Sequence, residues 1–132
     1  MPYITAYLST AIVFLAIDAV WLGIVATRFY RDALEHLISP NVNFAAAAGF
    51  YLVYCIGIVI FAVIPALKLG DWSHAALYGA LFGFFCYATY DMTNLATLRD
   101  WPVIIVIVDV AWGTFLTGTA AVAGYFITRA LS

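Results

Sequence analysis

Charged side chains are scarce in this sequence. Lysine and arginine supply five of the 132 residues and aspartate and glutamate seven, so 9% of the chain is charged, whereas a typical soluble domain is about a quarter charged. Five dispersed basic residues are too few for the positive surface that binds nucleic acid. The composition therefore excludes a nucleic-acid-binding protein and makes a water-soluble fold a poor explanation of the chain.

Cysteine and histidine are rarer still, with two of each. Cys55 and Cys86 stand alone within apolar runs, which favours apolar packing over a disulfide framework or a thiol redox site. His36 and His74 fall at opposite ends of the helical bundle expected below, and we predict no metal site. No lysine or arginine precedes the first apolar run, so a cleaved leader is not expected there.

Apolar surface is what the sequence has in excess, since 67% of the residues are hydrophobic and 17% are aromatic. Crossing a bilayer takes about 20 mostly apolar residues. Four segments meet this length, at about 3–27, 43–67, 73–98 and 102–128. Backbone groups in lipid must be bonded within their own segment, which favours helices, and the alternation of barrel strands is absent. We predict an all-α, polytopic membrane protein, a single domain built as a bundle of four transmembrane helices in the lipid bilayer.

The longest connection follows the first span. Residues 28–38 place Ala33, Leu34 and Leu37 on one side and charged residues elsewhere, which predicts a short interfacial helix or an extension of the first span. Four spans put both termini on the same side of the membrane. Basic residues are almost evenly divided between the two ends of the bundle, so the charge rule favours cytoplasmic loops only slightly.

Turn residues separate the spans. We expect Asn41 or Asn43 to cap the second span, Asp71 or Ser73 to cap the third and Asp100 to cap the fourth, because short polar side chains bond the free N–H groups of a first helical turn.

Three aspartates interrupt the apolar spans. A charged side chain at the centre of a membrane helix costs about 2.5 to 3.5 kcal/mol. With a rise of about 1.5 Å per residue, Asp18, Asp91 and Asp109 lie at depths of about 15, 12 and 10 Å from the end that bears Arg28 and Arg99. Three different helices therefore carry an acid into the same layer, and we expect the acids to meet inside the bundle.

The neighbours of these acids add polar and aromatic groups to the layer. Trp21 and Trp112 each follow an aspartate by three residues and share its helix face. On the third span Gly79 and Gly83 form a G-x-x-x-G step, which lets another helix approach closely, and the same stripe continues to the third acid. The predicted binding residues are Asp18, Asp91, Asp109, Asn94, Trp21, Trp112, Tyr87 and Tyr90.

Purely structural roles explain the same residues. Asp18 and Asp109 could be protonated packing groups bonded to an indole or a backbone carbonyl, because burial favours the neutral carboxyl. The segment "DMTN" (91–94) is also typical of a helix break in which Asp91 caps a short piece near the interface. The sequence leaves both interpretations open.

Three segments together resemble one family: D-x-x-W-L-G in the first span, "CYATYDMTNLATLRDWP" (86–102), and D-x-x-W-G-T in the last. The resemblance is to a family of small bacterial four-span membrane proteins known as a domain of unknown function, and it covers essentially the whole chain. It implies an inner-membrane protein of a bacterium. It carries no substrate, reaction or catalytic residue.

Three functions compete at this point. The first is transport or binding of a proton, a cation or a small polar solute at the three acids, with a homodimer expected because four helices are few to enclose a route. The second is a membrane-embedded enzyme acting on a lipid or isoprenoid, although D-D-x-x-D and H-E-x-x-H motifs are absent. The third is an accessory subunit whose aromatic residues hold a hydrophobic ligand. The sequence identifies no cofactor.

Overall fold

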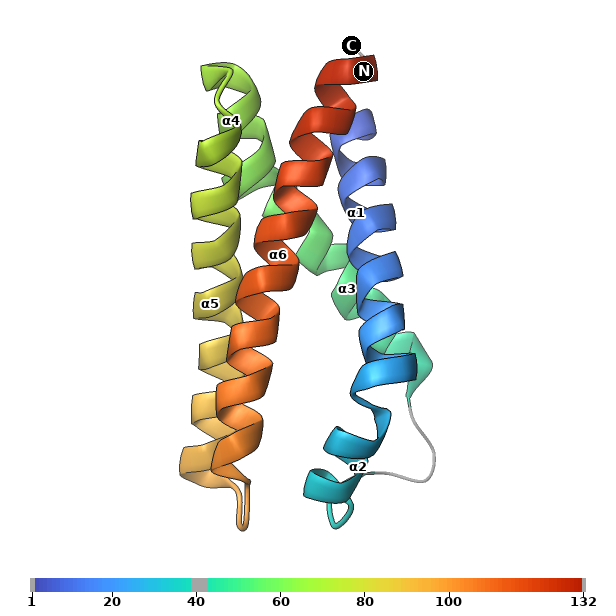
Figure 1. The fold of residues 1–132 in the computed structure, drawn as a ribbon, viewed down its shortest axis with the longest axis vertical. Helices are drawn as coiled ribbons and strands as arrows, with labels where there is room; N and C mark the ends of the chain where they lie inside the picture. Colours follow the sequence, from blue (N-terminus) through green and yellow to red (C-terminus); the bar gives the residue numbers. More distant parts are fainter. Residues whose placement is uncertain (1, 39–42, 132) are drawn as a thin grey trace.

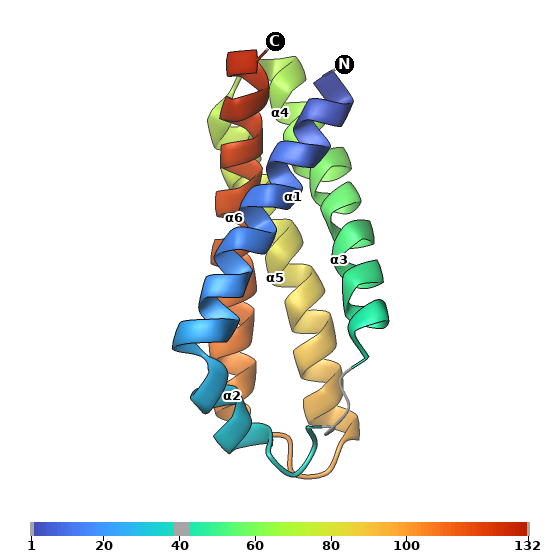
Figure 2. The same ribbon diagram turned by 90° about the vertical axis from the view of Figure 1, so that its right-hand side faces the viewer.

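The computed structural model describes residues 2–38 and 43–131, and all the regular structure in these residues is helical. The elements are α1 (Pro2–Val20), η1 (Trp21–Val25), α2 (Thr27–Leu34), α3 (Phe44–Ile58), η2 (Val59–Val63), α4 (Ile64–Leu69), α5 (Trp72–Thr97) and α6 (Val103–Leu131). They form four long helical rods, which are α1 with η1, α3 with η2 and α4, α5, and α6. Both termini lie at one end of the bundle, and α2 lies at the other (Figures 1 and 2).

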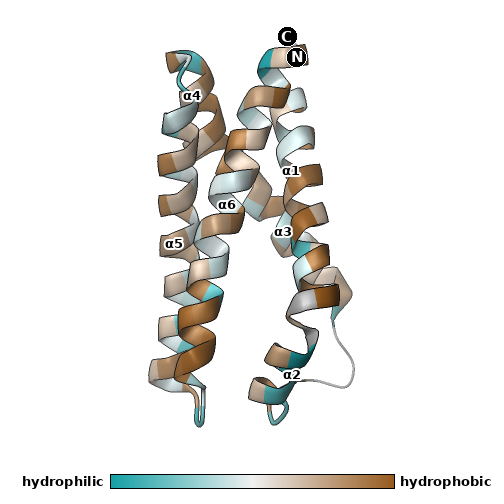
Figure 3. Ribbon diagram, in the orientation of Figure 1, coloured by the Kyte–Doolittle hydropathy of each residue, from teal (hydrophilic) through white to brown (hydrophobic). Residues whose placement is uncertain are grey.

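The outer surface of this bundle is apolar, whereas the surface of a soluble protein carries mainly polar and charged side chains. Many of the largest apolar side chains are exposed on its outer faces, Ile24 and Phe44 among them. Figure 3 shows the hydrophilic residues mainly at the two ends and on α2. Helices that are apolar around their whole circumference are typical of a membrane protein. The all-α membrane fold predicted from the sequence is confirmed.

Within the described residues, three helical segments are both long and apolar enough to cross a bilayer: Pro2–Ile24, Phe44–Leu69 and Val103–Leu131. The 26 residues of α5 give it the length of a span, but its tyrosines, threonines and Asp91 make it less apolar than the other three. It packs beside α6 along most of its length (Figure 1). The fourth span therefore remains a prediction, supported by the length and position of α5.

Two rods contain π-helical segments, which widen the helix by one residue per turn and often occur near functional sites. In the first rod, η1 begins at Trp21, three residues after Asp18, and the chain bends at Ala26 before α2 begins. In the second rod, η2 precedes Pro65, whose ring has no N–H and crowds the preceding turn. The predicted helix after the first span is present as α2.

Helices α5 and α6 approach closely because both present glycines at their contact. A Cβ atom at Gly79 would lie 2.7 Å from that of Ala121, and one at Gly83 would collide with the carbonyl oxygen of Gly113. Both distances are shorter than van der Waals contact. The G-x-x-x-G step of α5 thus serves the close approach that its spacing predicts.

The helix caps agree with the sequence at two of three places. The Asn43 side chain accepts the N–H of Ala46, and Asp71 accepts the N–H of Ser73, so these residues cap α3 and α5. The alternative cap Asn41 lies outside the described residues. The predicted cap at Asp100 is wrong, because this residue has a φ of 60° in the left-handed turn before α6, and the helix begins only at Val103.

Candidate functional site

The three aspartates lie on the inner side of the bundle. Asp18 is 5% exposed and Asp91 is completely buried, while Asp109 is half-buried. Asp91 stands within α5, which continues without interruption to Thr97. The alternative in which Asp91 caps a helix break is therefore wrong.

Asp18 is held by aromatic residues of two other helices. The indole N–H of Trp112 donates to its Oδ1 over 3.3 Å, and the Tyr51 hydroxyl also interacts with its carboxyl group. The ring of Trp21 stacks on that of Trp112, with centroids 4.2 Å apart and planes 12° from parallel. The two tryptophans therefore pair with each other, and Trp112 serves the aspartate of α1 and not the one on its own helix.

Asp109 receives a hydrogen bond from α2. The Tyr30 hydroxyl donates to its Oδ1 over 2.9 Å. Tyr30 reaches this position because α2 packs against the start of α6, where Phe29 and Leu34 contact the cluster around Trp101 and Ile105. The bend at Ala26 thus lets α2 pack beside this end of the bundle and brings a donor to the acid.

Asp91 has the least favourable surroundings of the three acids. Among the described residues, neither of its carboxyl oxygens has a hydrogen-bond donor. Its polar neighbour is the carboxyl group of Asp109, close enough for a hydrogen bond when one of the two is protonated. Two ionised carboxylates in contact repel strongly where water is scarce. The pair therefore requires a shared proton or a bound cation.

No basic side chain relieves this charge in the part of the chain that the structure describes. The partners of the three acids are tyrosines, Trp112 and another carboxyl group. No group of three or more histidine, cysteine or acidic residues in the described ranges is placed to hold a metal ion. In the described residues, two buried acids and one half-buried acid have no basic side chain beside them, an arrangement suited to take up positive charge from outside.

A cavity of about 440 Å³ opens beside the acids, between α3, α5 and α6. Five aromatic rings, one thiol and one carboxyl group form its lining: Phe50, Tyr51, Tyr54, Cys86, Tyr87, Tyr90 and Asp109. Tyr51 and Tyr87 interact electrostatically with both Asp18 and Asp109. These two tyrosines therefore lie between Asp18 and the pair of carboxyl groups formed by Asp91 and Asp109.

The predicted residues fall into an inner and an outer group. Tyr87 lines the cavity and packs on Gly113, whereas Tyr90 lines it with 58% of its surface exposed. Asn94 is half-buried one turn further along α5 and interacts with Tyr90. No contact of Asn94 with the acids is observed in the described residues, so it belongs to the rim.

The sequence prediction omitted Tyr30, Phe50, Tyr51 and Tyr54 from the site. Helical rise alone gives Tyr51 and Tyr54 the depth of the acids, but no pattern in the sequence assigns them a partner. Tyr30 could have been found, because it extends the apolar face of Ala33, Leu34 and Leu37 at helical spacing.

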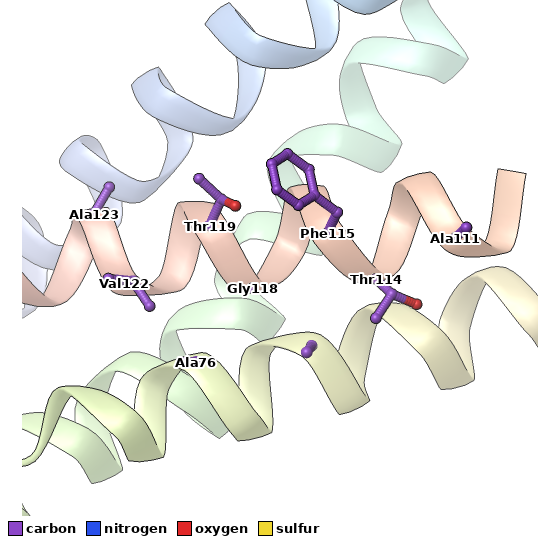
Figure 4. A pocket seen from close by; sticks show the side chains of 9 residues that line it. Ala76, Ala111, Thr114, Phe115, Gly118, Thr119, Val122 and Ala123 are labelled. Atoms are coloured by element: carbon purple, nitrogen blue, oxygen red, sulfur yellow. The ribbon is translucent and has the colours of Figure 1, made fainter. Parts of the chain in front are cut away.

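A larger surface groove of about 560 Å³ follows the outer junction of α5 and α6 (Figure 4). Small and apolar residues line it, including Ala76, Ala111 and Gly118, and none of its lining residues is charged. It has no group that could bind a proton or a cation, so the cavity beside Asp109 is the candidate site.

Comparison with known proteins agrees with this description. A family model described as "Predicted membrane protein (DUF2177)" matches residues 3–126. The chain belongs to this family. The membership confirms the family resemblance found in the sequence and the assignment as a membrane protein. No curated protein and no solved structure matches the chain.

Proposed function

We propose that this member of the family binds protons or cations at its buried acids and couples that binding to the passage of a small solute across the membrane. The observation that carries the proposal is the burial of Asp91 beside the carboxyl group of Asp109, where the described residues provide neither a donor for Asp91 nor a basic side chain. Intramembrane acids of this kind are typical of ion and proton pathways. We place the protein in the inner membrane of a bacterium.

The geometry supports exchange of a proton at this position. Asp91 is completely buried, whereas Asp109 is half-buried and lines a cavity. A proton or cation that enters through the cavity meets Asp109 first and is then shared with Asp91. Because a single protomer has few helices to enclose a route, a homodimer is part of the proposal.

The proposal is tested first by proton binding. Infrared difference spectra of the protein in lipid, recorded between pH 5 and pH 9, should contain the carbonyl stretch of a buried protonated carboxyl group. We expect Asp91→Asn and Asp109→Asn each to remove this band. The matched control Asp32→Asn changes an exposed acid on α2 and should leave it unchanged.

The second test is proton flux. Vesicles that contain the protein and an internal pH dye should acidify after an external acid pulse faster than empty vesicles. If the wild-type protein shows neither the infrared band nor a flux that Asp91→Asn and Asp109→Asn abolish, the proposed function is wrong.

A further inference from the structure

The lining of the cavity beside Asp109 has an unusual composition. Aromatic rings form most of its wall, and one carboxyl group provides the only formal charge. The rings are in contact with one another: Tyr54 lies 5.5 Å from Phe50 and 6.1 Å from Tyr87 between centroids. The face of an aromatic ring is electronegative and attracts a cation within about 6 Å. The wall and the acid therefore favour the same sign of ligand charge.

The size and the donor set indicate what kind of cation fits. A cavity of about 440 Å³ is within the range of small organic ligands. Calcium and similar hard ions need about six to eight oxygen ligands, whereas the lining offers one carboxyl group and a few hydroxyl groups. A neutral apolar molecule would bury Asp109 without compensation, and an anion would be repelled by it.

We propose that the cavity binds an organic cation, an ammonium group on a hydrophobic body, between the aromatic rings and the Asp109 carboxylate. This inference rests on the proposed function, because it names the class of solute that exchanges with the proton there. The ammonium group would lie between Asp109 and the rings of Tyr87 and Tyr90, and the hydrophobic body would contact the rings of Phe50 and Tyr54. A second copy of the chain is not required for this contact.

Binding of the cation should release the proton of the carboxyl pair. Among the described residues, the titratable groups that face Asp109 or share its cavity are Tyr30 from α2, Tyr51 and Tyr54 from α3, and Cys86, Tyr87, Tyr90 and Asp91 from α5. None of them is basic, so the pair holds either the proton or the organic cation. Affinity for the cation should therefore fall as the pH falls, with up to one proton released for each monovalent cation bound.

The experiment is equilibrium dialysis of the purified protein with benzyltrimethylammonium at pH 8.5 and pH 5.5. The comparison ligand is neopentylbenzene, which has the same shape with carbon in place of the charged nitrogen. We expect saturable binding of the cation that weakens at the lower pH, and at least tenfold weaker binding of the neutral ligand.

Variants separate the roles of charge and ring. Asp109→Asn should weaken cation binding at least tenfold. Tyr90→Leu removes a partly exposed ring and should weaken it about 3- to 30-fold, the range of a cation–π contact, while Tyr90→Phe stays within about twofold. The matched controls are Asp32→Asn and Tyr78→Leu, which change an acid and a tyrosine outside the cavity.

Equal binding of both ligands, or cation binding that Tyr90→Leu and Asp109→Asn leave unchanged, would overturn this inference. Because Tyr90 is largely exposed, its variants still decide the outcome if Asp109→Asn does not fold. Failure here is distinct from failure of the proposed function: a protein that keeps the infrared band and proton flux but ignores the cation retains the function and loses only this solute class.

Discussion

At the scale of single residues, Trp112 has two separable contacts. Its N–H donates to Asp18 and its ring stacks on Trp21. Trp112→Phe keeps a ring that can stack but removes the donor from a buried carboxyl group, which we expect to destabilise the protein by about 1.5 to 3 kcal/mol. Thermal unfolding in detergent measures this effect. Trp72→Phe, at an exposed position at the start of α5, is the control, and equal stability of the two variants would contradict the assignment.

A substitution at Asp91 should have the opposite effect on stability from Trp112→Phe. A buried acid without a donor lowers stability, so Asp91→Asn, which offers an amide donor to Asp109 at almost the same volume, should raise the melting temperature. The same variant should lose the infrared band described above. Thermal unfolding beside Asp32→Asn is the measurement, and a lower melting temperature for Asp91→Asn would show that the carboxyl group stabilises the bundle.

The acids were predictable because a charge within an apolar run is conspicuous, and their common depth follows from the helical rise. Their partners were not. Residues three apart share a helix face, so the sequence favoured pairs within one helix, whereas the bond from Trp112 to Asp18 depends on how α1 and α6 are rotated about their axes. Helical spacing places Tyr30 on the apolar face of α2, but its bond to Asp109 depends on the bend at Ala26, which no local pattern in the sequence predicts.

At the scale of elements, the contact of α5 with α6 requires glycine. Gly83→Ala would force a methyl group against the Gly113 carbonyl oxygen, and we expect a loss of about 1 to 3 kcal/mol from overpacking. Gly49→Ala is a matched control within α3, where a Cβ atom meets nothing within 4 Å, and it should stabilise the helix by up to about 1 kcal/mol. Unfolding in detergent should order the two variants on opposite sides of the wild type.

The cap of α5 gives a prediction that depends on pH. Hydrogen bonds from the hydroxyl and the N–H of Ser73 lower the pKa of Asp71 below its usual value. A lowered pKa in the folded state stabilises the protein above the unfolded pKa of about 3.9, and this contribution is lost as the pH falls through the folded value. Wild-type protein should therefore be more stable than Asp71→Asn at pH 7, and the difference should begin to shrink below about pH 4 and vanish only once the pH lies below the folded pKa. A difference that stays constant between pH 7 and pH 3 would contradict this assignment.

Helix type and approximate bounds followed from apolar length, and the caps at Asn43 and Asp71 followed from side-chain chemistry. The π-helical segments were not predicted, because they arise from one extra residue in a turn and leave the apolar pattern intact. The predicted helix cap at Asp100 is wrong because aspartate is equally suited to a helix cap and to a left-handed turn.

At the scale of the whole molecule, the position of both termini at one end of the bundle tests the number of spans (Figure 1). Reporters fused after residues 70 and 131 should lie on the same side of the membrane as the N-terminus, and one fused after residue 100 should lie on the opposite side. Enzymatic reporters active on only one side make this measurement. If the fusions after residues 70 and 100 report the same side, α5 does not cross between them and the count of four is wrong.

The bond between Trp112 and Asp18 joins residues 94 positions apart. This separation affects how the chain inserts into the membrane while it is being synthesised. Helix α1 leaves the ribosomal exit tunnel before Trp112, which donates the hydrogen bond to Asp18, has been synthesised. The nascent first helix must therefore wait beside the insertion machinery or enter lipid with its acid neutralised. Fragments that stop short of α6 should consequently be poorly retained and rapidly cleared by membrane proteases.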